Sequence, residues 1–202
     1  MITDNITKIR KMEVYAKENN VPIMLPDGIE FLLKYIKENN IKSILEIGTA
    51  IGYSSVRMAL ISDDIKVTTI ERDQIRYQEA LKNIKDFSLE EQIKVIYADA
   101  LDVNLDEKYD LIFIDAAKSQ YIKFFEKFKH NLAETGVIIS DNLEFHGLVE
   151  NKDNLQLSKN LKGLVRKINE YVSFLKDNYE FTTTFYSIGD GIGVSIRKQN
   201  KN

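Results

Sequence analysis

The sequence contains no cysteine, and among its 202 residues it has only two histidines and two prolines. The lack of cysteine excludes disulfide bonds and thiolate metal sites, and it fits a reducing compartment such as the cytoplasm. With His130 and His146 as the only histidines, there is little scope for an imidazole-rich zinc site. The sequence therefore excludes thiolate metal sites and leaves little basis for a histidine-rich zinc site.

Long apolar segments are missing as well. No apolar run approaches the roughly 20 residues that a membrane-spanning helix needs, and the N-terminal segment MITDNITKIRKMEVYAKENN lacks the apolar core of a signal peptide. We therefore expect a cytoplasmic protein that does not enter a membrane. The net charge of −3 gives no overall attraction to polyanions, so only local basic patches could bind nucleic acid.

Apolar runs rich in Ile and Val alternate along the chain with segments of helical pattern. This alternation predicts a parallel sheet covered by helices on both faces, in a single α/β domain over residues 1–202. The expected strands are Ser43–Ile47, Lys66–Ile70, Lys94–Tyr97, Leu111–Ile114 and Gly136–Ser140. The expected helices are Tyr53–Leu60, Asp73–Ile84 and Gln120–Asn131, the last followed by a turn at Glu134-Thr135-Gly136.

The two ends of the chain depart from this alternation. Residues 1–40 carry two amphipathic helical patterns with no strand between them. We interpret them as helices for dimer and acceptor contacts, with packing on the chain's own sheet as the alternative. Apolar residues at helical spacing between Leu161 and Leu175 predict another helix. After it, Phe181–Ser187 and Gly193–Arg197 flank a Gly-Asp-Gly turn and predict a β-hairpin.

Residues 44–55, ILEIGTAIGYSS, have the pattern of a strand, a turn with two glycines and the start of a helix. Gly48 and Gly52 let the backbone bend sharply and approach a ligand closely, although the spacing is not the G-x-G-x-x-G of a dinucleotide site. Glu71 ends the next strand, where an acid can accept hydrogen bonds from both ribose hydroxyls, and Asp99-Ala100 follows the third strand, where a loop would meet adenine. An ordinary βα turn is the alternative, but the order of these features favours adenosine binding.

Oxygen ligands follow two later strands. Asp115 ends the run LIFI, and Asp141-Asn142 ends the run VIIS. Three such donors at neighbouring strand ends suit a hard cation such as Mg²⁺. Lys118 can reach the same crevice, where it could act as a general base or as an oxyanion partner. The alternative is that these acids cap the following helices or form a turn.

Four separated motifs resemble the class I, cation-dependent O-methyltransferases, which include catechol and caffeoyl-CoA O-methyltransferases. They are residues 44–55, Glu71, IDAAKSQY at 114–121 and ISDN at 139–142, and the resemblance extends from about Val21 to the terminal GDGIGVSIRK. It implies a Rossmann-like seven-stranded sheet with an antiparallel last strand, a homodimer, S-adenosylmethionine as methyl donor, and Mg²⁺ or another hard divalent cation.

The resemblance also implies roles for individual residues. Lys118 would be the catalytic lysine, with Asp115 beside it, and the metal ligands would be Asp115, Asp141 and Asn142. The S-adenosylmethionine site would be lined by Glu46, Gly48, Gly52, Ser54, Glu71, Asp99, Ala100 and Asp115.

The methyl acceptor is less constrained, because a catechol and a 5-hydroxyuridine both offer two adjacent oxygens to a cation. The IDAAKSQY and DNLEFHGLV stretches look most like a bacterial branch that includes tRNA 5-hydroxyuridine methyltransferase, so tRNA is our first expectation and a small phenol the alternative. A non-catalytic adenosine-binding module is the third reading. Candidate RNA-binding patches are Lys118, Lys123, Lys127 and Lys129, and further along Lys159, Lys162, Arg166 and Lys167.

Overall fold

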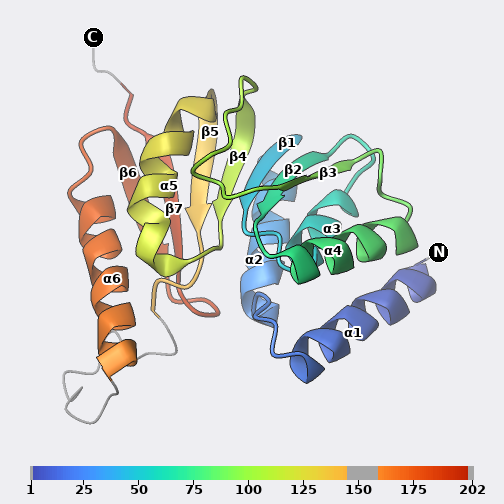
Figure 1. Ribbon diagram of the computed structural model, residues 1–202. Helices are drawn as coiled ribbons and strands as arrows, with labels where there is room; N and C mark the ends of the chain where they lie inside the picture. Colours follow the sequence, from blue (N-terminus) through green and yellow to red (C-terminus); the bar gives the residue numbers. More distant parts are fainter. Residues whose placement is uncertain (1, 145–158, 200–202) are drawn as a thin grey trace.

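The computed structural model describes residues 2–144 and 159–199 and contains one twisted sheet that runs through the molecule (Figure 1). Its strands are β1 (Ser43–Ile47), β2 (Lys66–Glu71), β3 (Ile93–Tyr97), β4 (Tyr109–Ile114), β5 (Leu132–Ser140), β6 (Phe181–Tyr186) and β7 (Ile192–Arg197). They lie in the order β3-β2-β1-β4-β5-β7-β6. Strands β1 to β5 are parallel, and β7 is antiparallel to both neighbours. The Rossmann-like seven-stranded sheet with a C-terminal antiparallel hairpin is thereby confirmed.

The helices fall where the sequence pattern places them, within a few residues at each end. They are α1 (Ile2–Glu18), α2 (Pro26–Glu38), α3 (Tyr53–Ala59), α4 (Gln74–Asp86), α5 (Tyr121–Phe128) and α6 (Lys159–Lys176). The single helix expected over residues 120–131 is instead α5 flanked by two 3₁₀ turns, η1 (Lys118–Gln120) and η2 (Lys129–Asn131). Within the described ranges, none of these helices is long and apolar enough to cross a membrane.

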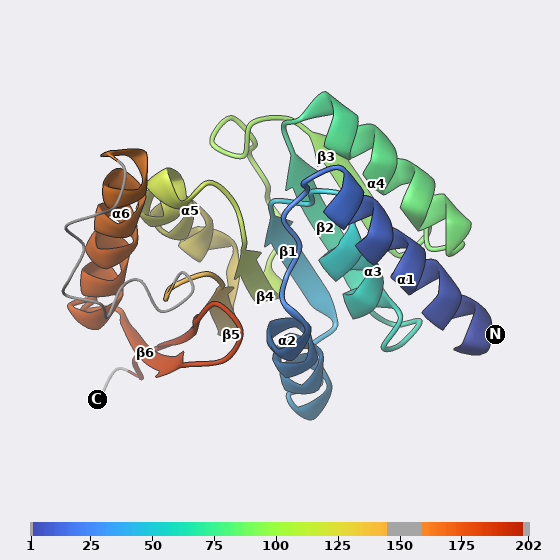
Figure 2. The same ribbon diagram turned by 90° about the horizontal axis from the view of Figure 1, so that it is seen from below.

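Both faces of the sheet are buried at its centre, which explains why β4 is apolar at every position from Leu111 to Ile114. In β4, Leu111 and Phe113 belong to one apolar cluster, whereas Ile112 and Ile114 belong to a second, and all four are fully buried. Figure 2 shows α5 and α6 on one side of the sheet and α2 on the other. Because alternate residues of a strand point to opposite faces, a strand covered on both sides needs apolar residues at every position.

The N-terminal helices contribute to the core, and their part in dimer and acceptor contacts stays a prediction. Ile29, Leu32 and Ile36 of α2 are at most 1% exposed. Met12 and Ala16 of α1 join the same cluster. The apolar stripe of each helix therefore packs on the chain's own sheet and its neighbouring helices, as the alternative reading had it.

The turn expected at Glu134-Thr135-Gly136 is also wrong. These residues lie inside β5, whose pairing with β4 jumps from Tyr109↔Leu132 to Leu111↔Val137. The intervening residues form an irregular bulge in which Glu134 and Thr135 are exposed. A turn and a bulge share the same sequence signals, small and polar residues, so the pattern alone did not separate them.

Candidate functional site

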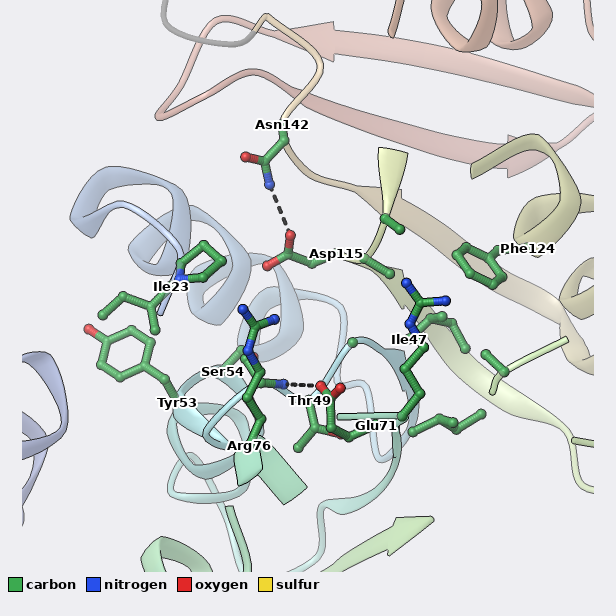
Figure 3. Close-up of a pocket in the computed structure, with 18 of the residues that line it drawn as sticks. Ile23, Ile47, Thr49, Tyr53, Ser54, Glu71, Arg76, Asp115, Phe124 and Asn142 are labelled. Atoms are coloured by element: carbon green, nitrogen blue, oxygen red, sulfur yellow. Dashed lines mark hydrogen bonds between the residues drawn. The ribbon is translucent and has the colours of Figure 1, made fainter. Parts of the chain in front are cut away.

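A cavity of about 330 Å³ opens at the carboxyl ends of β1, β2 and β4 (Figure 3). In open α/β sheets this edge, where the strand order reverses, is the usual place for a ligand. The structure brings most of the predicted site residues to this one cavity: Gly48, Ser54, Glu71, Asp99, Ala100, Asp115, Lys118 and Asn142 all line it. Glu46, Gly52 and Asp141 do not line it.

Gly48 makes the tight turn that brings β1 against the end of β4. Its φ is +104°, and a Cβ at this position would lie 2.1 Å from the carbonyl oxygen of Asp115. Gly52 also has positive φ, +80°, and stands directly before α3. Only glycine tolerates the combination of left-handed backbone and close approach at Gly48. Gly48 therefore shapes the floor of the cavity, and Gly52 shapes the turn into α3.

Glu71 is held in a fixed position at the end of β2. Its Oε2 accepts a hydrogen bond of 2.8 Å from the backbone N–H of Ala50, and its Oε1 accepts one of 2.8 Å from that of Asp73. The side chain is buried apart from 7% of its surface. Because each oxygen retains a further lone pair, the fixed carboxylate can still accept hydrogen bonds from a ligand.

Asp99 and Ala100 line the wall beside Glu71. The Oδ1 of Asp99 accepts from the backbone N–H of Leu101, and its Oδ2 lies 3.3 Å from a guanidinium nitrogen of Arg72. This corner therefore combines two ordered carboxylates with a buried apolar residue, which suits a sugar and a flat base.

Glu46 lies behind the cavity and supports the turn. It is fully buried and accepts hydrogen bonds from the hydroxyls of Ser54, Ser55 and Thr69. Burial raises the pKa of Glu46 to about 7, although the three hydroxyls oppose that rise. These contacts tie β1, β2 and α3 together, so Glu46 fixes the residues that line the cavity and does not face a ligand itself.

The opposite end of the cavity holds Asp115, Asn142 and Lys118. Asn142, with φ +65°, donates its amide to Oδ1 of Asp115 at 2.9 Å and accepts from Nζ of Lys118 at 3.3 Å. Burial raises the pKa of Asp115 and lowers that of Lys118. The sequence motifs from two separate strands thus meet in one hydrogen-bonded cluster (Figure 3).

Asp141 lies next to this cluster, and the burial of its carboxyl group is unfavourable for the stability of the fold. It is 3% exposed, and its Oδ1 has no hydrogen-bond partner in the described part of the chain. Burial and the nearby charge of Asp115 both raise the pKa of Asp141. Two adjacent buried carboxylates, one with a free oxygen, are an arrangement that a cation would relieve. The described residues contain no group of three or more His, Cys, Asp or Glu fit for a metal, so such a site needs the amide of Asn142 as well.

Comparison with known proteins adds the family. The sequence matches the O-methyltransferase family over residues 3–198. The chain belongs to this family. It is 31% identical to Tapetum-specific methyltransferase 1 of Arabidopsis thaliana over 187 residues, covering 89% of this chain and 78% of that protein. It is 27% identical to a caffeoyl-CoA O-methyltransferase of Populus kitakamiensis over 191 residues, covering 91% and 81%.

Solved structures that are similar to this chain agree with its assignment to the O-methyltransferase family. A Staphylococcus aureus protein that has been assigned as a caffeoyl-CoA O-methyltransferase superposes with a TM-score of 0.88 and is 42% identical, covering 94% of this chain and 92% of that one. An O-methyltransferase from Bacillus cereus, solved in complex with SAH, gives a TM-score of 0.80 at 25% identity, with 95% and 91% covered.

Both candidate basic patches of this O-methyltransferase contain cations that form ion pairs within the chain. Lys129 is 8% exposed and forms ion pairs with Glu126 and Glu180. On α6, Arg166 and Lys167 both pair with Glu170. The side chain of Lys159 and residues 145–158, including His146, lie outside the described residues.

Reading of the sequence also missed residues of the cavity. Tyr53, Arg76 and residues 22–24 between α1 and α2 line it. Residues 22–24 carry no motif, since only tertiary packing brings them to the strand ends. Arg76 had a usable signal: it lies in the first turn of a helix that begins directly after Glu71, and Asp73 caps its backbone N–H at 2.9 Å.

Proposed function

We propose that this O-methyltransferase transfers a methyl group from S-adenosylmethionine to a hydroxyl that has a second oxygen beside it, as in a catechol, with the help of a divalent cation. One observation carries the proposal. A single cavity contains Glu71, an acid placed to bind ribose hydroxyls, at one end and the cluster of Asp115, Lys118 and Asn142 at the other. The sites that we assign to the methyl donor and to the methyl acceptor are therefore adjacent.

The donor half follows from the corner around Glu71. The fixed carboxylate can accept both ribose hydroxyls, and Asp99 and Ala100 bound the space for adenine. The close approach of the backbone at Gly48 brings this corner within reach of Asp115. The B. cereus relative was solved with SAH, the product of a donor of this kind.

The acceptor half rests on the chain's own oxygen ligands. Asp115, Asp141 and Asn142 would hold a hard divalent cation, which would lower the pKa of an acceptor hydroxyl when bound. The unsatisfied oxygen of Asp141 and its raised pKa fit that use. Lys118 lines the cavity beside them, and burial lowers its pKa, so its Nζ can take the hydroxyl proton or stabilise the oxyanion that remains.

The acceptor that we favour is a small phenol. The relatives named above include a caffeoyl-CoA O-methyltransferase, and caffeoyl-CoA carries a phenolic ring. A 5-hydroxyuridine in tRNA offers the same pair of oxygens, but the ion pairs of Arg166 and Lys167 with Glu170 weaken the argument for an RNA-binding patch on α6. The structure holds one chain, so the expected homodimer stays a prediction.

An acceptor panel tests this proposal. With S-adenosylmethionine and Mg²⁺, we expect methylation of catechol and, because its two hydroxyls are too far apart to bind one cation together, a rate on resorcinol lower by roughly a hundredfold. Mass spectrometry of the products gives both rates. The third arm is tRNA that carries 5-hydroxyuridine.

Each arm of the panel has a distinct consequence. Equal rates on catechol and resorcinol would contradict the chelation of two adjacent oxygens. Methylation of tRNA alone would replace the phenol with the modified base as the acceptor. Methylation of none of the three, in a protein that binds the donor, would favour a non-catalytic adenosine-binding module.

A further inference from the structure

Arg76 reaches from α4 into the cavity, at a corner that the donor and acceptor residues above do not occupy. Figure 3 shows its side chain rising beside Ser54, with Tyr53 on one side, Glu71 on the other, and Asp115 and Asn142 beyond its end. The cavity therefore has three corners: one around Glu71, one around Asp115, and one formed by Arg76, Ser54 and Tyr53.

The guanidinium of Arg76 has no partner among the residues that the structure describes, whereas the acids of the cavity have partners there. Glu71 accepts from two backbone N–H groups, Asp99 pairs with Arg72, and Asp115 accepts from Asn142. In residues 2–144 and 159–199, no ion pair or hydrogen bond involves the guanidinium of Arg76, although the residue is partly buried. A half-buried guanidinium that faces a cavity favours an anionic ligand with planar oxygens.

The position of Arg76 in its helix points the same way. It lies in the first turn of α4, where the helix dipole favours anions and disfavours a cation. Arg76 therefore gains nothing from the helix itself. An anion bound at the third corner would interact favourably with both the guanidinium and the helix start.

Ser54 shares this corner but has already used its proton. Its hydroxyl donates to Oε1 of the buried Glu46, so its oxygen can accept a hydrogen bond but has no hydrogen left for an anion. Arg76 is thus the charged donor at this corner. The hydroxyl of Ser54 can accept a hydrogen bond from an ammonium group, and the guanidinium of Arg76 can donate to a carboxylate. An ammonium and a carboxylate are the two charged groups of an α-amino acid.

We propose that Arg76 binds the α-carboxylate of S-adenosylmethionine and thereby selects for the amino-acid tail of the donor. This inference rests on the proposed function, since it requires that the donor occupy this cavity. The adenosine end lies in the corner of Glu71 and the methyl group faces the cluster of Asp115, which leaves the third corner for the tail. The carboxylate is the single anionic group that this donor carries.

Two ligands that differ by the tail test the proposal in the full-length protein. S-adenosylhomocysteine has the amino-acid tail, and 5′-methylthioadenosine lacks it. We expect Arg76→Met, which keeps an unbranched apolar stem but removes the guanidinium, to weaken binding of S-adenosylhomocysteine about 10- to 100-fold by isothermal titration, in line with the loss of a charged hydrogen bond. Binding of 5′-methylthioadenosine should stay within about threefold.

Matched variants keep the result interpretable. Arg72→Met removes the arginine that pairs with Asp99 in the adenosine corner, so it should change the two affinities in parallel. Arg76→Lys keeps the charge without the planar pair of donors and should give an intermediate, tail-specific loss. Circular dichroism and thermal unfolding of each variant show whether it is folded.

A loss confined to the ligand with the tail supports the role of Arg76. Parallel losses for both ligands, or no loss for either, in folded Arg76→Met would overturn it while leaving the proposed donor in place. Wild-type protein that binds neither ligand would overturn the proposed function, and the role of Arg76 with it.

Discussion

Replacing Asp141 by asparagine is expected to lower methyl transfer to a catechol by a factor on the order of a hundred or more, because the variant loses an anionic ligand of the cation. Affinity for S-adenosylhomocysteine should remain within severalfold, since Asp141 does not line the cavity in which Glu71 and Gly48 form the donor corner. Initial rates at saturating donor, with isothermal titration alongside, separate the two effects.

The stability of this variant distinguishes lost chemistry from lost folding. Burial and the charge of Asp115 raise the pKa of Asp141, so at neutral pH, above the pKa of an unfolded aspartate, this carboxyl must take up a proton on folding and thereby destabilises the metal-free fold. Asp141→Asn should therefore unfold at the same temperature as wild type or higher when Mg²⁺ is absent. Asp63→Asn, the same change at an exposed carboxylate, is the control. Near-normal turnover of Asp141→Asn at limiting Mg²⁺ would refute the assignment of Asp141 as a ligand.

Gly48→Ala should abolish detectable donor binding. The added Cβ would lie 2.1 Å from the carbonyl oxygen of Asp115, and the φ of +104° is strained for alanine. The turn must shift, and both the donor corner and Asp115 must shift with it. We expect affinity for S-adenosylhomocysteine to fall beyond about a hundredfold, and the free energy of unfolding to drop by about 3 kcal/mol or more.

Gly163→Ala provides the matched control for that substitution. Gly163 lies within α6, and a Cβ there would meet no atom within 4 Å. Alanine at this helical position should leave donor binding unchanged and stabilise the protein by about 0.5–1 kcal/mol. If Gly48→Ala bound the donor as tightly as Gly163→Ala does, the close approach of the backbone would have no part in the site.

The residues that sequence reasoning placed correctly are those whose position follows from strand order. Glu71 and Asp115 each end an apolar run, and parallel strands bring their carboxyl ends to one edge, so adjacency follows from topology. Gly48 was identifiable because a turn between a buried strand and a helix needs a residue with unusual backbone freedom. The family motifs at 114–121 and 139–142 then indicated which strand ends lie together, and Asn142 and Asp115 form a hydrogen bond there.

What the pattern could not supply depends on contacts between segments far apart in the chain. Lys129 looked like a surface cation until its pairing with Glu180, 51 residues away, was seen. The apolar face of α2 was compatible with packing on a partner or on the chain's own core, because an amphipathic pattern does not show which surface covers the apolar face. Arg76 carried a local signal, but its aim into the cavity depends on how α4 packs on the sheet.

Removal of the cation is the most direct test of the central claim, that this O-methyltransferase joins a donor site to a cation-assisted acceptor site in one cavity. The measurement is the rate of catechol methylation by the wild-type protein with methyl-labelled S-adenosylmethionine, first after chelation with EDTA and then with Mg²⁺ returned in excess. We predict a rate near background in the chelated sample, full recovery on addition of Mg²⁺, and donor affinity that chelation leaves within severalfold. Methylation that proceeds at the same rate in EDTA would contradict the account.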